Sequence, residues 1–362
     1  MKGISLLFNT LSSVFSKRGY IVLLKGEILM KFFIASKDIG IDLGTSNTII
    51  YVKGQGILLS EPSVVAINTA NGQVLAVGLE AKNMIGRTPE GIETIQPLKD
   101  GVIANFDLTE QMLKKFIEKV NGKGAFKSSR MAICHPSGIT EVEKRAINEA
   151  ISQVGARKVM LIEETVAAAI GSGLPVNEPV GSMIINIGGG TTEVAVISLY
   201  GIVTSKTLRV AGDALDETII GYVKREFNLV IGERTAEKVK IELGSVFADE
   251  DEEEKNMEIR GRDLKTGLPR AVIITESQVR GALKEPVAVI IEAIKAVIEQ
   301  TPPELAADIM DKGIMLTGGG AFLKGLNKLI FSELHIPSNI SEEPLECVVL
   351  GAGRCLDMID KI

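Results

Sequence analysis

Apolar positions along the chain form short β-type runs that end in glycine turns, and longer stretches with helical spacing. The clearest turn follows a mostly apolar run, 183–186, which enters three consecutive glycines at 188–190. Thr191 and Thr192 come next, and apolar positions resume at Val194. This order predicts a β-hairpin whose turn can bring bare backbone against a ligand. Its N–H groups can form an anion-binding nest, although a turn that only requires glycine backbone angles is an alternative.

The same design occurs a second time, near the beginning of the chain. Residues 38–52 read as an apolar strand, a polar residue, a turn of sequence GTSNT and a second apolar strand. Such an internal repeat predicts two related lobes that each present a phosphate-binding turn to a shared cleft. A Walker P-loop is not expected, because neither turn has the GxxxxGK[ST] lysine or opens a helix. The two segments align at Asp42 with Asn186, Gly44 with Gly188 and Thr48 with Thr192.

Strand and helix patterns alternate through the rest of the chain. Helical spacing is clearest at 109–120 and 277–300, and a capping box of Thr140 and Glu143 opens a further helix. A tight hairpin turn is expected at 71–72, where Asn precedes Gly. The other predicted helices are 81–85, 166–171, 214–227, 235–243, 302–311, 321–333 and 347–360. The other predicted strands are 64–67, 131–134, 159–162, 202–210 and 313–317, and segments 261–267 and 271–275 are expected to form a further hairpin.

Composition and charge narrow the class of protein. With 362 residues, 45% hydrophobic and 24% charged, the chain suits two globular lobes. A net charge of −6, without a basic stripe, argues against a nucleic-acid partner. The cysteines, at 134, 347 and 355, are scattered and odd in number, which favours reduced thiols in the cytoplasm. Because His135 and His335 are the only histidines, histidine catalysis and histidine metal sites are not expected.

Three segments carry candidate chemistry, each with a structural alternative. Glu164 follows a predicted strand and opens a helix. There it either orients a water at a phosphate or only interacts favourably with the positive end of the helix dipole. Glu237 and Lys240 lie one helical turn apart, and they form either a surface ion pair or a polar face for a ribose. Glycines 318–320 follow a strand, and a flat base can lie on such bare backbone.

A further glycine-rich segment, 121–127, carries a phenylalanine between two lysines. Ala125 and Phe126 lie between Lys123 and Lys127. A phenylalanine in this setting either dips into an anionic membrane or folds back onto the core. The segment alone leaves both alternatives open.

Residues 1–37 are a separate problem. They are apolar, but Lys17, Arg18, Lys25, Glu27 and Lys31 interrupt them, so no run is long enough to span a bilayer. A secretory signal is an alternative, without a clear cleavage site. Codons for residues 25–27 can form a purine run like a bacterial ribosome-binding site, and Met30 follows closely. We therefore expect translation to start at Met30, from which a weak amphipathic membrane anchor is an open alternative.

Together these motifs closely resemble the MreB/Mbl family of bacterial actins, in the actin-like ATPase superfamily. The resemblance covers about 38–362 and implies an α/β actin-like ATPase fold. In that fold two duplicated lobes, each a mixed sheet flanked by helices, hold a nucleotide in the cleft between them. The matching stretches are IDLGTSNT (41–48), EPSVVAI (61–67), KDGVIANF (99–106), GGGTTEVAVIS (188–198), IGERTAEKVKIELG (231–244), RGRDLKTGLPR (260–270), the segment 301–326 with its LTGGG, and EEPLECVVLGAG (342–353).

The resemblance implies ATP and Mg²⁺ as cofactors and gives roles to individual residues. Glu164 and Thr191 would act on the attacking water, and Asp42 would hold Mg²⁺ through water. The loop with Ala125 and Phe126 matches the membrane-inserting loop of the family. Phosphate would be held by Thr45, Ser46, Asn47, Gly189, Gly190 and Thr191, with Gly44, Asn186, Gly188 and Thr192 beside them, and the nucleoside by Glu237, Lys238, Val239, Lys240, Gly319, Gly320, Ala321 and Phe322.

The same resemblance divides the chain into an N-terminal extension and four parts. The extension is 1–37. Lobe I would have a core (IA) and a small insertion (IB), and lobe II would have a core (IIA) and a small insertion (IIB). The expected boundaries are 38–65, 99–179 and 347–362 for IA, 66–98 for IB, 180–215 and 281–346 for IIA, and 216–280 for IIB.

Two positions depart from the family pattern. The second hairpin of the family usually reads DIGGG, where this chain has Asn186, and its IEEP lacks the proline here, at Thr165. The neutral Asn186 removes a negative charge near the Mg²⁺ and the attacking water. Because phosphoryl transfer depends on positioning and electrostatics, losing one such group can cost about 10²–10³ in rate. We therefore expect ATP binding and polymerisation with slow hydrolysis.

The function implied is that of a filament-forming bacterial actin on the inner face of the cytoplasmic membrane. Its partners would be further copies of itself in paired protofilaments and membrane-embedded shape or wall-synthesis proteins. Two other classes of the superfamily are alternatives. A small-molecule kinase would need an acidic base in a second pocket, and none is located. A chaperone-type ATPase would carry a large substrate-binding domain after the lobes.

Mass spectrometry of the native N-terminus tests the expected start. We expect the first peptide to begin at Met30 or the following residue. A peptide from residues 6–17 would show that the segment is translated and would contradict the hypothesis.

Overall fold

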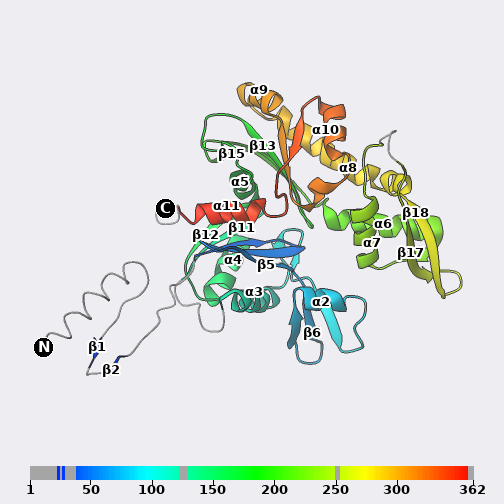
Figure 1. Cartoon of the computed structure of the whole chain (residues 1–362), viewed down its shortest axis with the longest axis horizontal. Helices are drawn as coiled ribbons and strands as arrows, with labels where there is room; N and C mark the ends of the chain where they lie inside the picture. Colours follow the sequence, from blue (N-terminus) through cyan, green and yellow to red (C-terminus); the bar gives the residue numbers. More distant parts are fainter. Residues whose placement is uncertain (1–22, 25–26, 29–37, 122–128, 249–252, 358–362) are drawn as a thin grey trace, which may run out of the picture.

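The computed structural model describes residues 23–24, 27–28, 38–121, 129–248 and 253–357. Two five-stranded mixed sheets form the centres of two lobes (Figure 1), which confirms the predicted fold class. Lobe I is built around the sheet of order β12-β11-β3-β4-β5, and lobe II around the sheet of order β15-β14-β13-β19-β20. Their strands are β3 (Ile39–Leu43), β4 (Asn47–Val52), β5 (Gly56–Pro62), β11 (Ser129–His135) and β12 (Ala156–Glu163) in lobe I, and β13 (Ser182–Ile187), β14 (Thr192–Ser198), β15 (Gly201–Leu208), β19 (Ile314–Thr317) and β20 (Ser338–Ile340) in lobe II.

The two sheets have the same topology, as the repeated hairpin predicts. In each, three antiparallel strands come first, and two later strands run parallel to the first of them. The turns are also alike: the N–H of Gly44 donates to the carbonyl of Asn47 at 3.1 Å, and that of Gly188 to the carbonyl of Thr191 at 2.9 Å. The alignment of the two hairpins from sequence therefore holds at the level of single hydrogen bonds.

Amphipathic helices cover one face of each sheet. In lobe I the predicted apolar face of α3 (Phe106–Asn121) is fully buried at Met112, Leu113, Phe116 and Ile117. The helix α4 (Glu141–Gln153) begins at the predicted Thr140–Glu143 capping box. The corresponding helices of lobe II are α6 (Gly212–Phe227), α8 (Glu276–Glu299), α9 (Pro303–Lys312) and α10 (Leu326–Leu334).

Two helices, α5 (Glu164–Gly171) and α11 (Cys347–Cys355), lie between the sheets of the two lobes (Figure 1). One buried cluster joins them to both sheets, because it contains alanines of β11, α5, β14 and α11. The two helices approach backbone to backbone through glycines. A Cβ at Gly171 would lie 1.8 Å from the carbonyl oxygen of Cys347, and one at Gly351 would lie 1.8 Å from that of Ala167. This layer fixes the distance between the lobes.

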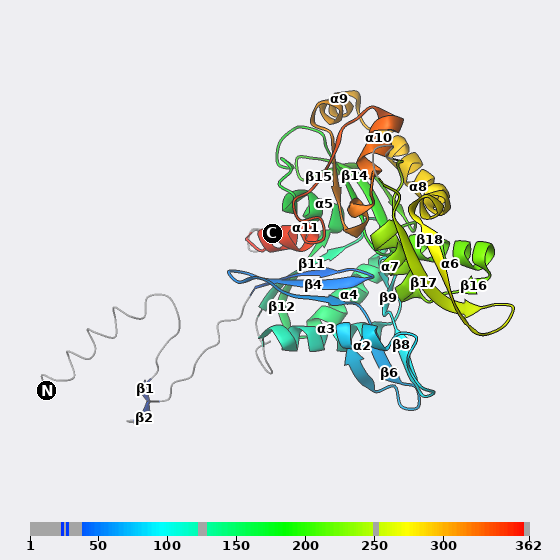
Figure 2. The same ribbon diagram turned by 45° about the vertical axis from the view of Figure 1, so that its right-hand side comes forward.

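Each lobe also carries a small three-stranded sheet with one helix (Figure 2). The boundaries of the four parts remain a prediction. The remaining elements are β6 (Val65–Asn68), β7 (Val74–Val77), β8 (Ile92–Ile95) and α2 (Leu79–Met84) in lobe I, β16 (Leu229–Val230), β17 (Asn256–Asp263), β18 (Pro269–Thr275) and α7 (Glu233–Leu243) in lobe II, and the two-residue pairs β9 (Leu98–Lys99) with β10 (Val102–Ile103) and β1 (Leu23–Leu24) with β2 (Glu27–Ile28).

Three predicted elements have other bounds in the structure. The predicted helix 321–333 is a 3₁₀ turn, η1 (Gly319–Phe322), followed by α10, because Gly325 takes a left-handed conformation (φ 79°) between them. The predicted hairpin of 261–267 with 271–275 is present as β17 and β18, but its first strand ends at Asp263, whose carboxylate accepts the backbone N–H groups of Lys265 and Thr266 and so closes the turn. Helix α11 ends at Cys355, short of the predicted end at 360, and residues 358–362 lie outside the described part.

The α5–α11 contact gives a test of what holds the lobes together. We expect Gly351→Ala to destabilise the protein by roughly 1–3 kcal/mol, because the new methyl would push the two helix backbones apart. Chemical denaturation measures this. Gly221→Ala is the matched control, since Gly221 lies in α6 with nothing within 4 Å of the added Cβ, and we expect a gain of about 0.4–1 kcal/mol there. Equal stability of both variants would contradict the prediction.

Candidate functional site

The structure brings the two glycine turns into direct contact. A Cβ at Gly189 would lie 1.8 Å from Oγ of Ser46, and one at Gly190 would lie 2.6 Å from Oγ1 of Thr45. Any side chain at either glycine would therefore separate the turns. The two glycines therefore allow the close approach of the lobes, in addition to the backbone angles of the hairpin turn.

The same turns have unused hydrogen-bond donors. Within the described part of the chain, no partner accepts the backbone N–H groups of Thr45, Ser46, Gly189 or Gly190. Thr45 and Gly190 are mostly buried, so such unsatisfied donors are costly unless something binds them. Converging N–H groups on glycine-rich backbone are suited to an anion such as a phosphate.

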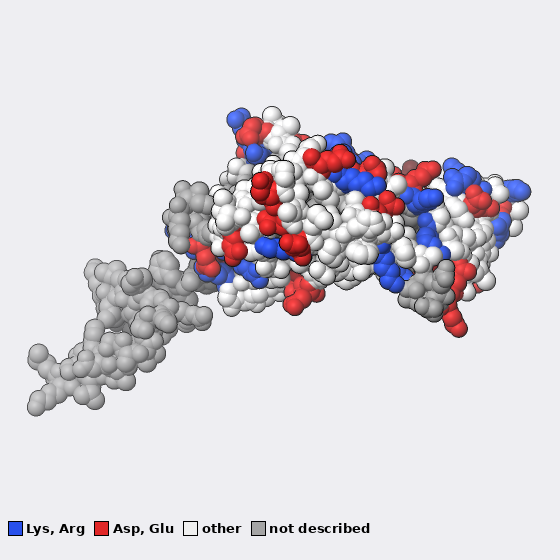
Figure 3. Space-filling view, turned by 90° about the horizontal axis from the view of Figure 1, so that it is seen from above, with Lys and Arg blue, Asp and Glu red and all other residues white. Residues whose placement is uncertain are grey.

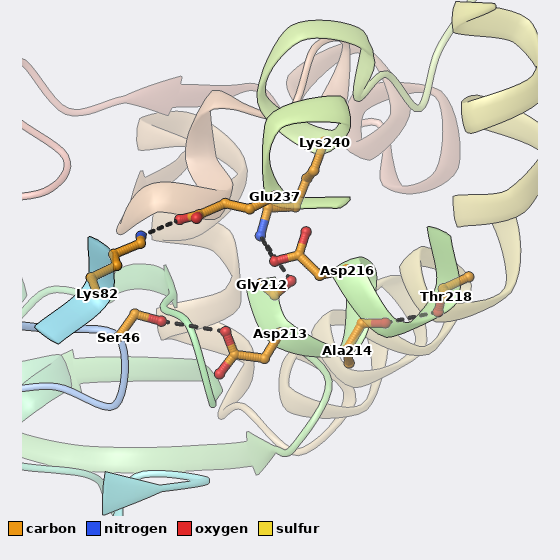
Figure 4. A network of polar contacts seen from close by, with 9 residues as sticks. All are labelled: Ser46, Lys82, Gly212, Asp213, Ala214, Asp216, Thr218, Glu237 and Lys240. Carbon is orange, nitrogen blue, oxygen red and sulfur yellow. Dashed lines mark hydrogen bonds and ion pairs between the residues drawn. The ribbon is translucent and has the colours of Figure 1, made fainter. Parts of the chain in front are cut away.

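A third segment supports the second turn from behind. At the start of α6, the N–H groups of Gly212 and Asp213 donate to the carbonyls of Gly188 and Gly189, at 3.1 and 2.8 Å. The side chain of Asp213 accepts from Oγ of Ser46 at 3.3 Å, so it also touches the first turn (Figure 4). The sequence analysis missed Asp213, although a Gly-Asp pair that opens a helix directly after a strand is a detectable signal.

Lys240 is part of this support. Its ammonium donates to the carbonyl of Gly212 at 2.9 Å and to Oδ2 of Asp216 at 2.7 Å (Figure 4). Burial raises the pKa of Asp216 to about 6, although the charge of Lys240 opposes this shift. The surface ion pair considered between Lys240 and Glu237 is therefore wrong.

Glu237 instead pairs with a residue of the other lobe. Its Oε1 accepts from Nζ of Lys82 at 2.8 Å, which links α7 of lobe II to α2 of lobe I (Figure 4). A second contact, from Nη1 of Arg234 to the carbonyl of Asn83 at 3.5 Å, joins the same two helices. Both side chains of the ion pair are about one-third exposed (31% and 37%), so it contributes only about 0.2–1 kcal/mol.

Below the turns lies a group of acidic and amide side chains on the sheet faces that pack on α5. Nδ2 of Asn186 points to Oε2 of Glu164 at 3.5 Å, and Oγ1 of Thr317 lies 3.4 Å from Oδ1 of Asn186. Asn186 thus presents a neutral donor to Glu164, where an aspartate would present a second carboxylate. Glu193, which the sequence analysis missed, pairs with Asn186 in the hairpin register and is 1% exposed. The sequence feature that could have drawn attention to Glu193 is that it is the one acid in an otherwise apolar strand.

Burial shifts these carboxyl groups toward their protonated forms. It raises the pKa of both Asp42 and Glu193 to about 7. Burial also raises the pKa of Glu164, and the charges of Glu193 and Asp42 raise it further. No group of three or more His, Cys, Asp or Glu side chains in the described residues is arranged to hold a metal ion directly. A role of Asp42 toward Mg²⁺ through water stays a prediction.

The third glycine segment lies on the end of β13. A Cβ at Gly318 would be 2.4 Å from the carbonyl oxygen of Ile187. One at Gly320 would be 2.1 Å from Cγ2 of the same isoleucine. Gly319 has only ordinary contact, at 3.4 Å, and Phe322 is 60% exposed. The loop therefore packs with one face and keeps the other face bare, as a base-binding loop requires.

Four residues that the resemblance places at the nucleotide have side chains that are buried or paired elsewhere. Val239 and Ala321 are fully buried in the core of lobe II, Thr192 donates its hydroxyl to the carbonyl of Val210, and Lys238 lies 3.7 Å from Glu242 on the surface. Two others, Ala125 and Phe126, lie outside the described residues.

Comparison with known proteins identifies the family. A sequence model described as "MreB/Mbl protein" matches residues 36–362. The cell shape-determining protein Mbl of Bacillus subtilis (strain 168) is 54% identical over 327 residues, which cover 90% of this chain and 98% of that protein. The chain belongs to the MreB/Mbl family. The cell shape-determining protein MreB of Escherichia coli (strain K12) is 52% identical over 330 residues, or 90% of this chain and 94% of that protein.

Two solved structures agree with this fold. MreB5 of Spiroplasma citri bound to AMPPNP superposes with a TM-score of 0.87 at 37% identity, over 90% of this chain and 98% of that chain. A MamK double helical filament superposes with a TM-score of 0.75 at 22% identity, over 89% and 98%, which supports the fold alone.

The buried carboxyl groups predict how the stability of this family member depends on pH. Their folded-state pKa values lie above those of an unfolded chain, so between about pH 5 and 8 the folded state binds more protons. We expect the nucleotide-free, chelator-treated protein to lose on the order of 1–3 kcal/mol of stability as the pH rises through this range. Denaturation at several pH values measures this.

The matched variants separate this effect from general destabilisation. Asp42→Asn should flatten the pH dependence. Asp263→Asn should not, because hydrogen bonds from Thr266, among others, lower the pKa of Asp263 to about 2 and keep it ionised throughout. A stability that is constant or rises between pH 5 and 8 would contradict the prediction.

Proposed function

We propose that this chain is an ATP-dependent, filament-forming bacterial actin that determines cell shape. The observation that carries the proposal is the contact between two glycine turns with unused N–H donors, one turn from each lobe. Relatives at 54% and 52% identity are named cell shape-determining proteins, and a structural neighbour is bound to AMPPNP. Neither a kinase nor a chaperone-type ATPase is favoured by these similarities.

The described residues fit a nucleotide in the following way. The free N–H groups around Thr45–Ser46 and Gly189–Gly190 would bind its phosphates. The bare face of Gly319 would receive the base. Glu237 lies at the cleft opening, where it would reach a ribose once its contact with Lys82 loosens.

Mg²⁺ belongs to the same proposal. When bound, it would neutralise phosphate charge. Asp42, the acid before the turn of the first hairpin, would hold the ion through water. The equivalent position of lobe II is the neutral Asn186, so position 186 of the second hairpin offers no charge to the ion. We infer that Glu164 and Thr191 act on the attacking water, and that hydrolysis is slow.

The filaments would lie on the inner face of the cytoplasmic membrane. In the described part of the chain, no helix is long and apolar enough to cross a bilayer. We infer that membrane contact comes from the loop with Ala125 and Phe126, which matches the membrane-inserting loop of the family. Other copies of the chain and membrane-embedded shape or wall-synthesis proteins would be the partners.

A nucleic-acid partner is not part of the proposal. The net charge is −6. On the face of the molecule in Figure 3, acidic and basic side chains are interspersed without a continuous basic stripe. Such a surface gives no electrostatic track for a phosphate backbone.

Sedimentation tests the proposed function. We expect the protein to pellet with Mg-ATP, and to co-pellet with anionic liposomes more than with neutral ones. Gly190→Ala should abolish ATP-dependent pelleting, because its methyl would lie 2.6 Å from Oγ1 of Thr45 and part the turns. Gly201→Ala is the control, with its nearest atom at an ordinary 3.6 Å. A protein that takes up ATP but stays in the supernatant under all conditions would contradict the filament proposal.

The slow hydrolysis has its own test. Asn186→Asp restores the family residue and adds a charge beside the proposed Mg²⁺ site, so we expect phosphate release to rise by roughly 10- to 10³-fold. Phosphate release at saturating ATP measures this. ATP affinity should change much less than the rate. An unchanged rate would show that the role given to position 186 is wrong.

A further inference from the structure

Glu193 is an acid where the duplicated fold does not need one. In the hairpin of lobe II it pairs with Asn186, and the corresponding pair in lobe I is Asp42 with Ile49. Ile49 is 5% exposed and Glu193 is 1% exposed, so both positions belong to the interior. Because burying a carboxyl group costs free energy unless it is hydrogen-bonded, an acid at an interior position needs a reason beyond packing.

The contacts of Glu193 cross from lobe II to lobe I. Its Oε1 accepts the backbone N–H of Ser137, in the loop that follows β11. The hydroxyl of Thr207 lies 3.3 Å from the same oxygen and 3.3 Å from the carbonyl of Ser137, so it can donate to either. The other oxygen, Oε2, is buried without a hydrogen-bond partner among the described residues.

The loop that Glu193 holds touches both sides of the site. Oγ of Ser137 lies 3.2 Å from Oγ1 of Thr165, the residue after Glu164 in α5. Pro136, one residue earlier, lies against Gly101: a Cβ there would be 2.6 Å from Pro136 and 3.1 Å from the methyl of Thr191. A short chain of contacts thus runs from the second turn, through Glu193 and the loop, to the start of α5.

We propose that Glu193 is a positioning residue for ATP hydrolysis, which fixes the 136–137 loop against β14 so that Glu164 and Thr191 face one attacking water. The inference rests on the proposed function, because it concerns the same reaction. Glu193 itself does not touch the nucleotide in this scheme. Its charge adds to the raised pKa of Glu164, which is consistent with their closeness.

Two substitutions at this position separate the hydrogen bond from the space that the side chain fills. Glu193→Ile introduces the residue of the equivalent position in lobe I and removes the acceptor. Glu193→Gln keeps an oxygen for the N–H of Ser137. We expect kcat for phosphate release to fall roughly 10- to 100-fold in Glu193→Ile, the cost of a misplaced reacting group, and by less than about threefold in Glu193→Gln. KM and the affinity for AMPPNP should stay within about threefold in both variants, since the phosphate-binding N–H groups are untouched.

A variant of the loop makes the test independent of whether Glu193→Ile folds. Ser137→Ala keeps the N–H that Glu193 accepts and removes only the contact with Thr165, and we expect it to lower kcat without changing KM. Wild-type kcat in both Glu193→Ile and Ser137→Ala would overturn the inference. So would an equal loss in Glu193→Ile and Glu193→Gln, because the bond would then not matter. Failure of the wild-type protein to bind AMPPNP would instead overturn the proposed function.

Discussion

The contact between the two glycine turns is the constraint on which the rest of the structure depends. Gly189 and Gly190 can meet Ser46 and Thr45 only if the lobes are held at one fixed separation. The layer of α5 and α11 sets this separation, and it does so through further glycines whose backbones touch. Both contacts leave no room for a methyl group. The cleft is thus formed by close backbone packing at its floor and behind it, while a weak ion pair joins its outer edge.

The duplication accounts for the shared backbone of the two lobes. The proposed chemistry depends on side chains that differ between equivalent positions of the two lobes. The sheets share one topology and one turn hydrogen bond, so each lobe provides the same kind of backbone cradle. The side chains at equivalent positions differ. Asp42 corresponds to the neutral Asn186, and the apolar Ile49 corresponds to the acidic Glu193. The acid nearest the proposed metal site and the acid that reaches across to the opposite lobe therefore come from different halves of the repeat.

The sequence alone predicted those features that depend on neighbouring residues. The repeated hairpins, the capping box at Thr140 and the amphipathic helix α3 all follow from local pattern, and all are present. The meeting of the two turns was also predicted from their repetition, but side-chain partners far apart in the chain were missed or wrong. Glu237 has Lys240 one turn away, yet its partner is Lys82, 155 positions earlier. No local signal distinguishes these partners, because the choice is made by how the lobes close.

Backbone angles limited the prediction in a second way. The segment after Gly318–Gly320 has helical spacing, and only the left-handed angles at Gly325 show that it breaks into two pieces. Glu193 was overlooked because one acid in an apolar strand looks like a surface position. Its burial follows from the α5 layer, which covers that face of the sheet.

The link between Lys82 and Glu237 couples the protein to its surroundings. Both side chains touch solvent, so dissolved ions weaken their attraction, with a screening length of about 8 Å at 0.15 M salt. Backbone packing at the floor is insensitive to salt. A change in ionic strength would therefore alter how readily this outer contact between the lobes opens while leaving the contact of the turns intact, so that ligand exchange would depend on the salt concentration.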